Sequence, residues 1–235
     1  MNFFDGLYSY EVVMLVVGTL TFLVVLFAFV FFLVKGKPLL KLMPFFVIPI
    51  VMIGFPSISA VRFKGDLIVI EKTIKQVEQN PADKSSREQL EKAAQRLTPR
   101  PFSNPKMLTA IAHAQIVLGD DTSALTTLDK ALKADPRSAE AGQLKRRIEL
   151  VRDLDKLIQH VEQNPADVSA KAELQKKVEE VTDSPITSPE TLVKVARAQA
   201  AIGQKAKALS TVEKALTINP NATAAIQLRS QIRRP

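Results

Sequence analysis

The chain has 235 residues, of which 46% are hydrophobic and 24% are charged, and its formal net charge is +8. The absence of cysteine excludes disulfides, thiolate metal sites and cysteine nucleophiles. These averages conceal a division, because two long stretches before residue 62 carry no charge and the sequence that follows is polar, charged and periodic. We therefore expect an integral membrane protein with a soluble part of about 170 residues, enough for one domain of ordinary size.

The soluble part has an excess of about seven basic residues, which are interleaved with acidic residues along helical stretches. A solvated helical surface explains this pattern, and an anionic partner or lipid surface is the alternative. Phe63 and Phe102 are the only aromatic residues of this part. Because single-stranded nucleic acids are bound on aromatic stacking platforms, we expect no nucleic-acid partner.

The first apolar stretch, residues 12–34, has 23 residues and would span about 34 Å as a helix. Its content of Leu, Val and Phe predicts a transmembrane helix. A cleaved signal peptide is the alternative, but the apolar run is too long for one and no basic residue precedes it.

The second apolar stretch, residues 42–61, contains Gly54 and three prolines, Pro44, Pro49 and Pro56. Proline removes a backbone donor and clashes with the preceding turn, so this helix is expected to kink or break. Two interpretations remain open: a complete but kinked crossing, and a re-entrant segment that enters the membrane only part of the way.

The short loop between the two apolar stretches carries Lys35, Lys37 and Lys41, whereas the amino-terminal tail has no Lys or Arg. Positive charge in short loops favours the cytoplasmic side. This pattern predicts a bacterial inner-membrane protein whose amino terminus and soluble part are periplasmic. Arg62 and Lys64 oppose that orientation, and the soluble part would be cytoplasmic if the second stretch does not cross.

The sequence VEQNPAD occurs at residues 77–83 and again at residues 161–167, 84 positions later. When residues 73–151 are placed over residues 157–235 without gaps, about 30 of the 79 pairs are identical. A module of 84 residues has therefore been duplicated within the chain.

The repeated motif predicts a corner between two helices. Asn-Pro is expected to end one helix, and Asp83 or Asp167 to cap the next. Direct binding of a ligand by the NPAD corner is the alternative. Residues 138–163, between the two copies, contain no proline and have apolar residues at helical spacing, so they predict one long helix, bent near Gly142.

Each module also predicts a pair of helices joined by a turn. In the first module, Asn104 is expected to cap a helix over residues 105–118, and Gly119 to supply its left-handed exit. A second helix is expected to run from there to about Ala134 and to stop at Asp135. The corresponding residues of the second copy are Ser188, Pro189, Gly203, Asn219 and Pro220.

Small residues are predicted where the two helices of a pair face each other. Ala112 and Ala124 are 12 positions apart, and Ala131 follows seven positions later. These alanines are expected to allow close approach of the helices, while Leu108 and Leu128 fill the surrounding space.

The spacing of these residues resembles that of the 34-residue tetratricopeptide repeat. The residues that carry the resemblance are Leu108, Ile111, Ala112, Gly119, Ala124, Leu128, Ala131 and Pro136 in the first copy, and Leu192, Val195, Ala196, Gly203, Ala208, Val212, Ala215 and Pro220 in the second. The chain departs from the family in two respects. Gln115 and Gln199 stand where the first helix usually has an aromatic residue, and extra helices separate the two motifs.

We therefore predict an all-α protein with three parts. Residues 1–61 form a membrane anchor, residues 62–152 form a first module similar to tetratricopeptide repeats, and residues 153–235 form a second.

No arrangement of residues typical of catalysis is present. His113 and His160 are isolated, and the sequence contains neither a glycine-rich phosphate loop nor a G-x-S-x-G motif. We expect no enzymatic activity, no cofactor, no metal and no small-molecule substrate.

The resemblance implies a scaffold whose first helices line a concave groove that takes a partner peptide. Transferred by position, the groove residues are Lys106, Thr109, Ala110, His113, Glu190, Val193, Lys194 and Arg197. The basic side chains among them favour an acidic peptide or a C-terminal carboxylate. The alternative is that these residues are simply exposed to solvent.

The expected function is that of a membrane-anchored scaffold or adaptor in the assembly or organisation of a membrane complex. The alternative is a structural accessory subunit of a larger membrane machine, held mainly by its transmembrane segments.

Overall fold

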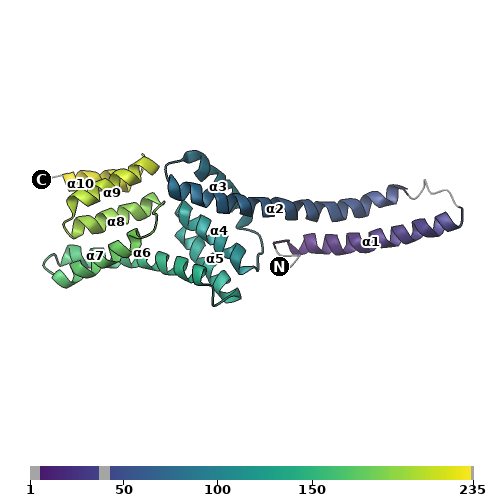
Figure 1. The fold of residues 1–235 in the computed structure, drawn as a ribbon, viewed down its shortest axis with the longest axis horizontal. Helices are drawn as coiled ribbons and strands as arrows, with labels where there is room; N and C mark the ends of the chain where they lie inside the picture. Colours follow the sequence, from purple (N-terminus) through teal and green to yellow (C-terminus); the bar gives the residue numbers. More distant parts are fainter. Residues whose placement is uncertain (1–5, 37–42, 234–235) are drawn as a thin grey trace.

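The computed structural model describes residues 6–36 and 43–233, and the predicted loop lysines Lys37 and Lys41 lie outside these ranges. Within the described ranges every regular element is a helix, which confirms the all-α prediction (Figure 1). The helices are α1 Ser9–Val34, α2 Val47–Gln79, α3 Lys84–Leu97, α4 Pro105–Leu118, α5 Asp121–Ala134, α6 Ala139–Gln163, α7 Val168–Thr182, α8 Pro189–Ala201, α9 Lys205–Ile218 and α10 Thr223–Arg233, with a short 3-10 helix, Met43–Phe46, before α2.

Helix α1 contains the first apolar stretch. Its amino-terminal end is capped by Glu11, whose carboxylate accepts a hydrogen bond from the Tyr8 backbone N–H at 2.9 Å. Thr19 and Thr21 donate their hydroxyls to the carbonyls one turn back, so neither polar group is left unsatisfied in the apolar run. In the described part of the chain, α1 is the helix long and apolar enough to cross a membrane.

The second apolar stretch does not break at its prolines. Pro44 lies in the 3-10 helix, and Pro49 lies in the first turn of α2, where no intrahelical partner for its missing N–H is required. Pro56 is the one proline inside α2, which continues past it to Gln79. Of the predicted kink or break, the break is therefore absent: Pro44 and Pro49 fall where helices tolerate proline, and the helix continues past Pro56.

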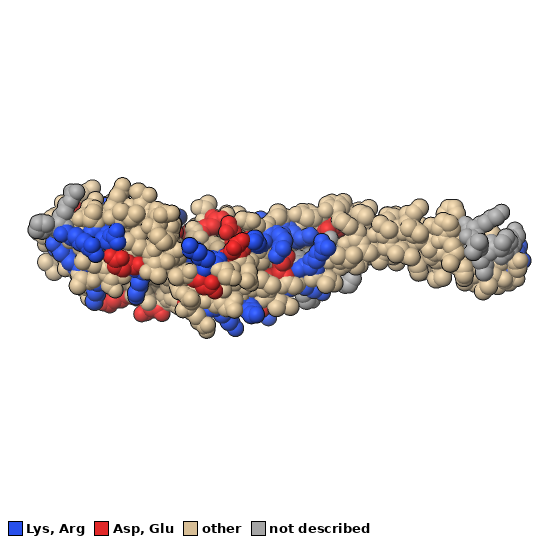
Figure 2. Space-filling model, turned by 90° about the horizontal axis from the view of Figure 1, so that it is seen from above, with Lys and Arg blue, Asp and Glu red and all other residues tan. Residues whose placement is uncertain are grey.

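Helices α1 and α2 form an antiparallel hairpin that extends from the rest of the molecule (Figure 1). Gly18 permits the close approach, because a Cβ atom there would lie 2.8 Å from the Met52 Cβ. The Phe46 ring meets those of Phe22 and Phe29 edge to face. Most other apolar side chains of the hairpin are exposed, and its surface is nearly free of charge in Figure 2. A continuous apolar surface of this extent needs a cover of lipid or protein.

The second half of α2 belongs to the core of the soluble part. Leu67, Ile70, Ile74 and Val77 are all buried there against helices α3 and α4. The predicted boundary between residues 61 and 62 therefore falls inside a continuous helix. No linker separates the apolar hairpin from the soluble part.

The helix boundaries repeat with the period of the sequence duplication. Helices α3, α4, α5 and α6 begin 84 residues before α7, α8, α9 and α10, and α2 ends 84 residues before α6. The core repeats in the same way, since Ile70, Ile74 and Leu90 correspond to the buried residues Leu154, Ile158 and Leu174. Helix α6 serves both modules, because its first half closes one and its second half opens the other.

The two NPAD corners have the predicted structure. Helices α2 and α6 end just before the corner, and the next helix is capped by Asp83 or Asp167. The Asp83 carboxylate accepts hydrogen bonds from the Ser86 hydroxyl at 2.6 Å and the Ser85 N–H at 3.0 Å. The Ser86 hydroxyl lowers the pKa of Asp83, and the Ala170 N–H lowers the pKa of Asp167. The corner recurs because it is the junction between two helices of the duplicated module.

The helix pairs also begin and turn as predicted. The Asn104 and Ser188 side chains accept hydrogen bonds from the first turns of α4 and α8. Gly119 and Gly203 have φ of 91° and 85°, a conformation that favours glycine. Pro136 and Pro220 are exposed just after α5 and α9, where they cannot extend the helix.

The predicted contact alanines are fully buried. Ala112, Ala124 and Ala131 have no exposed surface, and the same is true of Ala196, Ala208 and Ala215 in the second copy. Leu108 and Leu192 are buried beside them. A larger side chain at these positions would force the two helices apart.

Replacing Ala112 with Leu is therefore expected to lower the free energy of unfolding by about 1–3 kcal/mol. The matched control is Ala134→Leu, at an exposed position of the neighbouring helix, which should change it by no more than about 0.5 kcal/mol. Chemical denaturation of the full chain in detergent, followed by circular dichroism, measures both. Equal effects of the two substitutions would contradict the close-packed alanine contact.

Candidate functional site

The residues assigned to a groove by resemblance lie on α4 and α8. Lys106 and Glu190 are exposed, and Ala110 and Val193 are half-buried. Thr109 is only 2% exposed, and its hydroxyl donates to the Pro105 carbonyl at 2.8 Å. Thr109 therefore packs inside the module and does not face an open groove.

His113 and Arg197, two members of this set, contact the helix that opens their own module. The His113 Nε2 lies 3.1 Å from the Glu78 Oε1, and Arg197 pairs with Glu162 at 2.8 Å from its Nε. These two pairs occupy equivalent positions in the two modules, because Arg197 and Glu162 lie 84 residues after His113 and Glu78. The hydrogen bond to Glu162 raises the pKa of Arg197. Duplication has thus preserved a polar contact that places α2 over α4 and α6 over α8.

Lys194 makes a further contact of the same kind, with its Nζ 2.8 Å from the Asp155 Oδ2 on α6. Side chains that the sequence predicted to receive a partner therefore already have partners within the chain. A ligand of this face has to compete with these three contacts, although partly exposed surface pairs are individually weak.

An open cleft of about 720 Å³ lies beside this face in the first module. Its lining has both signs of charge and about as much apolar as polar surface; the residues are Glu78, His113, Glu140, Gln143, Leu144, Arg146, Arg147, Glu149, Leu150, Asp153, Glu180, Ser184 and Pro185. Five of these side chains are carboxylates and two are guanidinium groups, so the lining does not favour an anionic ligand.

The loop between α7 and α8 joins the two modules. Arg87 on α3 donates to the Thr187 carbonyl at 3.0 Å, and Arg147 on α6 donates to the Pro185 carbonyl. The Thr187 hydroxyl in turn donates to the Val117 carbonyl at the end of α4, at 3.1 Å. Three hydrogen bonds thus hold an extended segment of the second module on the first.

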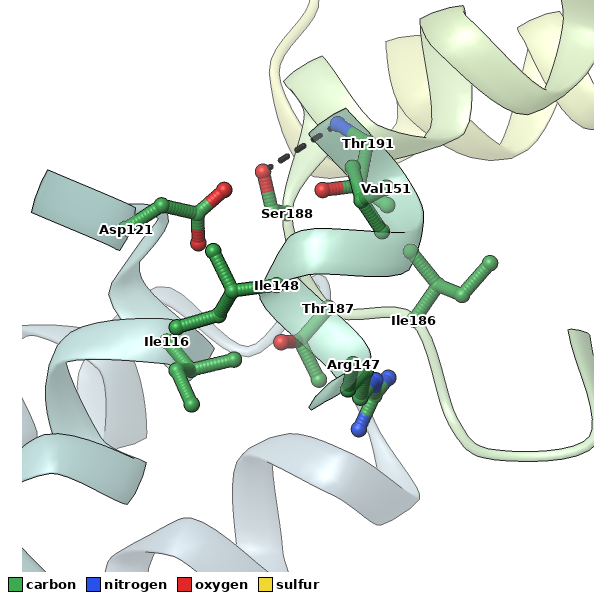
Figure 3. A pocket seen from close by; sticks show the side chains of 9 residues that line it. All are labelled: Ile116, Asp121, Arg147, Ile148, Val151, Ile186, Thr187, Ser188 and Thr191. Atoms are coloured by element: carbon green, nitrogen blue, oxygen red, sulfur yellow. Dashed lines mark hydrogen bonds between the residues drawn. The ribbon is translucent and has the colours of Figure 1, made fainter. Parts of the chain in front are cut away.

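The junction is tightly filled. A residual cavity of about 20 Å³, roughly the size of one water molecule, is lined by the side chains drawn in Figure 3. The Asp121 carboxylate points toward Ser188, which caps α8. Burial raises the pKa of Asp121 and lowers the pKa of Arg87 and Arg147. An acidic group beside the first turn of α8 is favoured by the helix dipole.

The corresponding loop of the first module contacts the amino-terminal segment of the chain. Arg100 donates to the Gly6 carbonyl at 3.1 Å and to the buried Glu11 carboxylate at 3.3 Å. Its guanidinium also lies 5.4 Å from the Tyr8 ring centroid, and the Tyr8 hydroxyl donates to the Pro99 carbonyl at 3.3 Å. These contacts hold the start of α1 against the soluble part (Figure 1).

Sequence reasoning identified neither of these loop contacts. Arg87 and Thr187 are 100 residues apart, and Arg100 and Glu11 are 89 apart. The duplication does place Pro101 and Pro185 at equivalent positions, which is the signal that the two loops share a role.

The described residues contain no group of three or more His, Cys, Asp or Glu side chains that could hold a metal ion. Comparison with protein-family models, with curated proteins and with solved structures found no match to this chain.

Replacing Arg147 with Ala is expected to loosen the loop at the module junction, because the donor to the Pro185 carbonyl is lost. Backbone amides of residues 184 and 186–188 should then exchange hydrogen several-fold faster, as measured by mass spectrometry on the full chain. The neighbouring exposed Arg146→Ala variant is the control and should leave exchange unchanged. Unchanged exchange in the Arg147 variant would exclude this role.

Proposed function

We propose that the protein is a membrane-anchored scaffold that holds a rigid helical-repeat domain at the membrane surface and docks partner proteins on it. The observation that carries this proposal is helix α2, which runs without interruption from an exposed apolar surface into the core of the repeated modules. Such a helix transmits the orientation of the anchor directly to the domain.

The hairpin is proposed to cross the membrane twice. If α1 spans the bilayer, its two ends lie on opposite sides, and the contact of Arg100 with Gly6 and Glu11 supports an amino terminus on the side of the soluble part. The second apolar stretch must then return across the membrane. This supports the complete crossing over the re-entrant alternative, and with Lys35 at the far end it supports a periplasmic domain.

The repeated helix pairs support the resemblance to tetratricopeptide repeats. In both copies the small residues of the motif lie at the contact between the two helices, and a glycine with positive φ follows the first helix of each. We propose on this basis that the domain acts by binding proteins and has no catalytic role. Assembly or organisation of a membrane complex is the process in which such a tethered repeat domain would serve.

An accessory structural subunit remains the second candidate, and the exposed surface of the hairpin favours it. Phe27, Val34 and Val61 are 76%, 81% and 72% exposed, and lipid or the transmembrane helices of another protein would cover them equally well.

The proposed orientation is testable by cysteine labelling because the chain has no native cysteine. Ser9→Cys and Ser169→Cys, both at exposed positions, should react with a membrane-impermeant maleimide from the same side of intact spheroplasts. Lys35→Cys should react only after permeabilisation. Reaction of Ser9 and Ser169 from opposite sides would contradict the two-crossing hairpin.

The scaffold proposal itself is tested by affinity purification of the full chain from native membranes in mild detergent, with quantitative mass spectrometry. We expect a protein partner to co-purify in stoichiometric amount. The partner should also be retained by a variant in which the exposed apolar residues of the hairpin are exchanged for other apolar residues and residues 6–11 and 62–79 are kept. Loss of the partner on this exchange would favour the accessory subunit, and retention of no partner by either form would end the scaffold proposal.

A further inference from the structure

The junction between the two modules has an equivalent at the end of the second module that no loop of the described residues fills. On the first module, the loop of residues 184–188 lies against Ile116, Asp121, Arg147 and Ile148. Adding 84 to these four positions gives residues that line an open pocket of about 290 Å³; they are Ala200, Lys205, Gln231 and Ile232. The carbonyl acceptor Val117 corresponds to Ala201, which also lines this pocket.

A second observation shows that the equivalent surface is uncovered. Gly119 and Gly203 occupy the same position in the two modules, with φ of 91° and 85°. A Cβ atom on Gly119 would lie 3.2 Å from the Ser188 Oγ of the docked loop, whereas a Cβ atom on Gly203 would have no atom of the described residues within 4 Å. The geometry that receives a loop on the first module is thus present and open on the second.

The second module also has side-chain hydrogen-bond donors at the two positions that hold the loop on the first module. Lys171 stands where Arg87 donates to the loop, and Gln231 stands where Arg147 does. Both can donate to backbone carbonyls. The smaller Ala200 and Ala201, in place of Ile116 and Val117, leave room for a larger apolar side chain than the Ile186 of the internal loop.

The two modules differ in the sign of one charge at this site. Lys205 replaces Asp121, whose carboxylate points toward Ser188 at the first junction (Figure 3). Lys205 is exposed and has no ion-pair partner among the described residues. Lys and Arg also gather at the end of the molecule that carries the carboxyl terminus (Figure 2). A ligand here should therefore carry an acidic residue at the position that corresponds to Ser188.

We propose that this pocket docks an extended segment of a partner protein, which pairs its backbone carbonyls with Lys171 and Gln231, inserts an apolar side chain beside Ala200 and Ala201, and presents an Asp or Glu to Lys205. The proposal rests on the scaffold function and supplies its docking surface and the chemistry of the partner. It places the partner at the end of the second module, where the pocket borders the Arg197–Glu162 pair of α8 and α6.

The probe is a fluorescent peptide with the sequence of residues 183–192 and the substitution Ser188→Asp. Aspartate is a good helix cap, so the substitution adds charge without loss of the local structure. The internal loop remains at the first junction because its effective concentration is high. Fluorescence anisotropy with the full chain in detergent is expected to show saturable binding.

Exchanging the charges of residue 205 in the chain and residue 188 in the peptide tests whether the peptide binds at this pocket. Lys205→Asp should weaken binding of the Ser188→Asp peptide by about three- to tenfold and strengthen binding of a Ser188→Lys peptide. Lys205 lies in the first turn of α9, where the helix dipole favours an acidic residue, so this variant should remain folded. Lys207→Asp, two residues further on and also exposed, is the control and should affect both peptides much less.

Absence of saturable binding at millimolar peptide, or equal effects of the Lys205 and Lys207 substitutions, would overturn the proposed site. If a stoichiometric partner nevertheless co-purifies with the full chain, the scaffold function stands and only this docking site is excluded. Peptide binding that follows the charge exchange, without any co-purified partner, would support the site and contradict the scaffold.

Discussion

The structure depends on one constraint: a single helix, α2, has to satisfy two environments. Its first half exposes apolar side chains along a hairpin with α1, and its second half buries Leu67, Ile70, Ile74 and Val77 in the core of the first module. Because α2 remains helical past Pro56, which lacks a backbone donor, and continues to Gln79, no loop separates these halves. The contacts of Arg100 with Gly6 and Glu11 fix the other helix of the hairpin to the same module.

The equivalent loops of the two modules extend this arrangement along the chain. The loop around Arg100 docks on the start of the hairpin, and the loop around Thr187 docks on the first module through Arg87 and Val117. Each module thus uses the same loop to contact the element that precedes it. The result is a stack in which every interface has hydrogen bonds from one loop, as expected for repeat proteins whose stability comes from neighbouring units.

Local chemistry made much of this fold predictable. Asn-Pro and Asp83 define a corner, Asn104 with Pro105 starts a helix, and Gly119 ends one, each through interactions within a few residues. The burial of Thr109 and the pairing of Arg197 were not predictable, because both depend on a neighbouring helix supplied by distant sequence. Resemblance of the motifs therefore located the helix contacts, whereas the burial of one groove residue and the internal pairing of another depended on the packing of distant segments.

The most direct test of this account is the distance between the hairpin and the repeat domain, measured by pulsed electron spin resonance on the cysteine-free chain. Nitroxide labels at Ser57→Cys and Ala134→Cys, in lipid nanodiscs, report on the continuity of α2, and labels at Gln89→Cys and Ala134→Cys give a reference within the domain. The account predicts one narrow distance distribution for each pair. A broad or multiple distribution for the hairpin pair, beside a narrow reference, would show that the domain swings freely on its anchor and would contradict it.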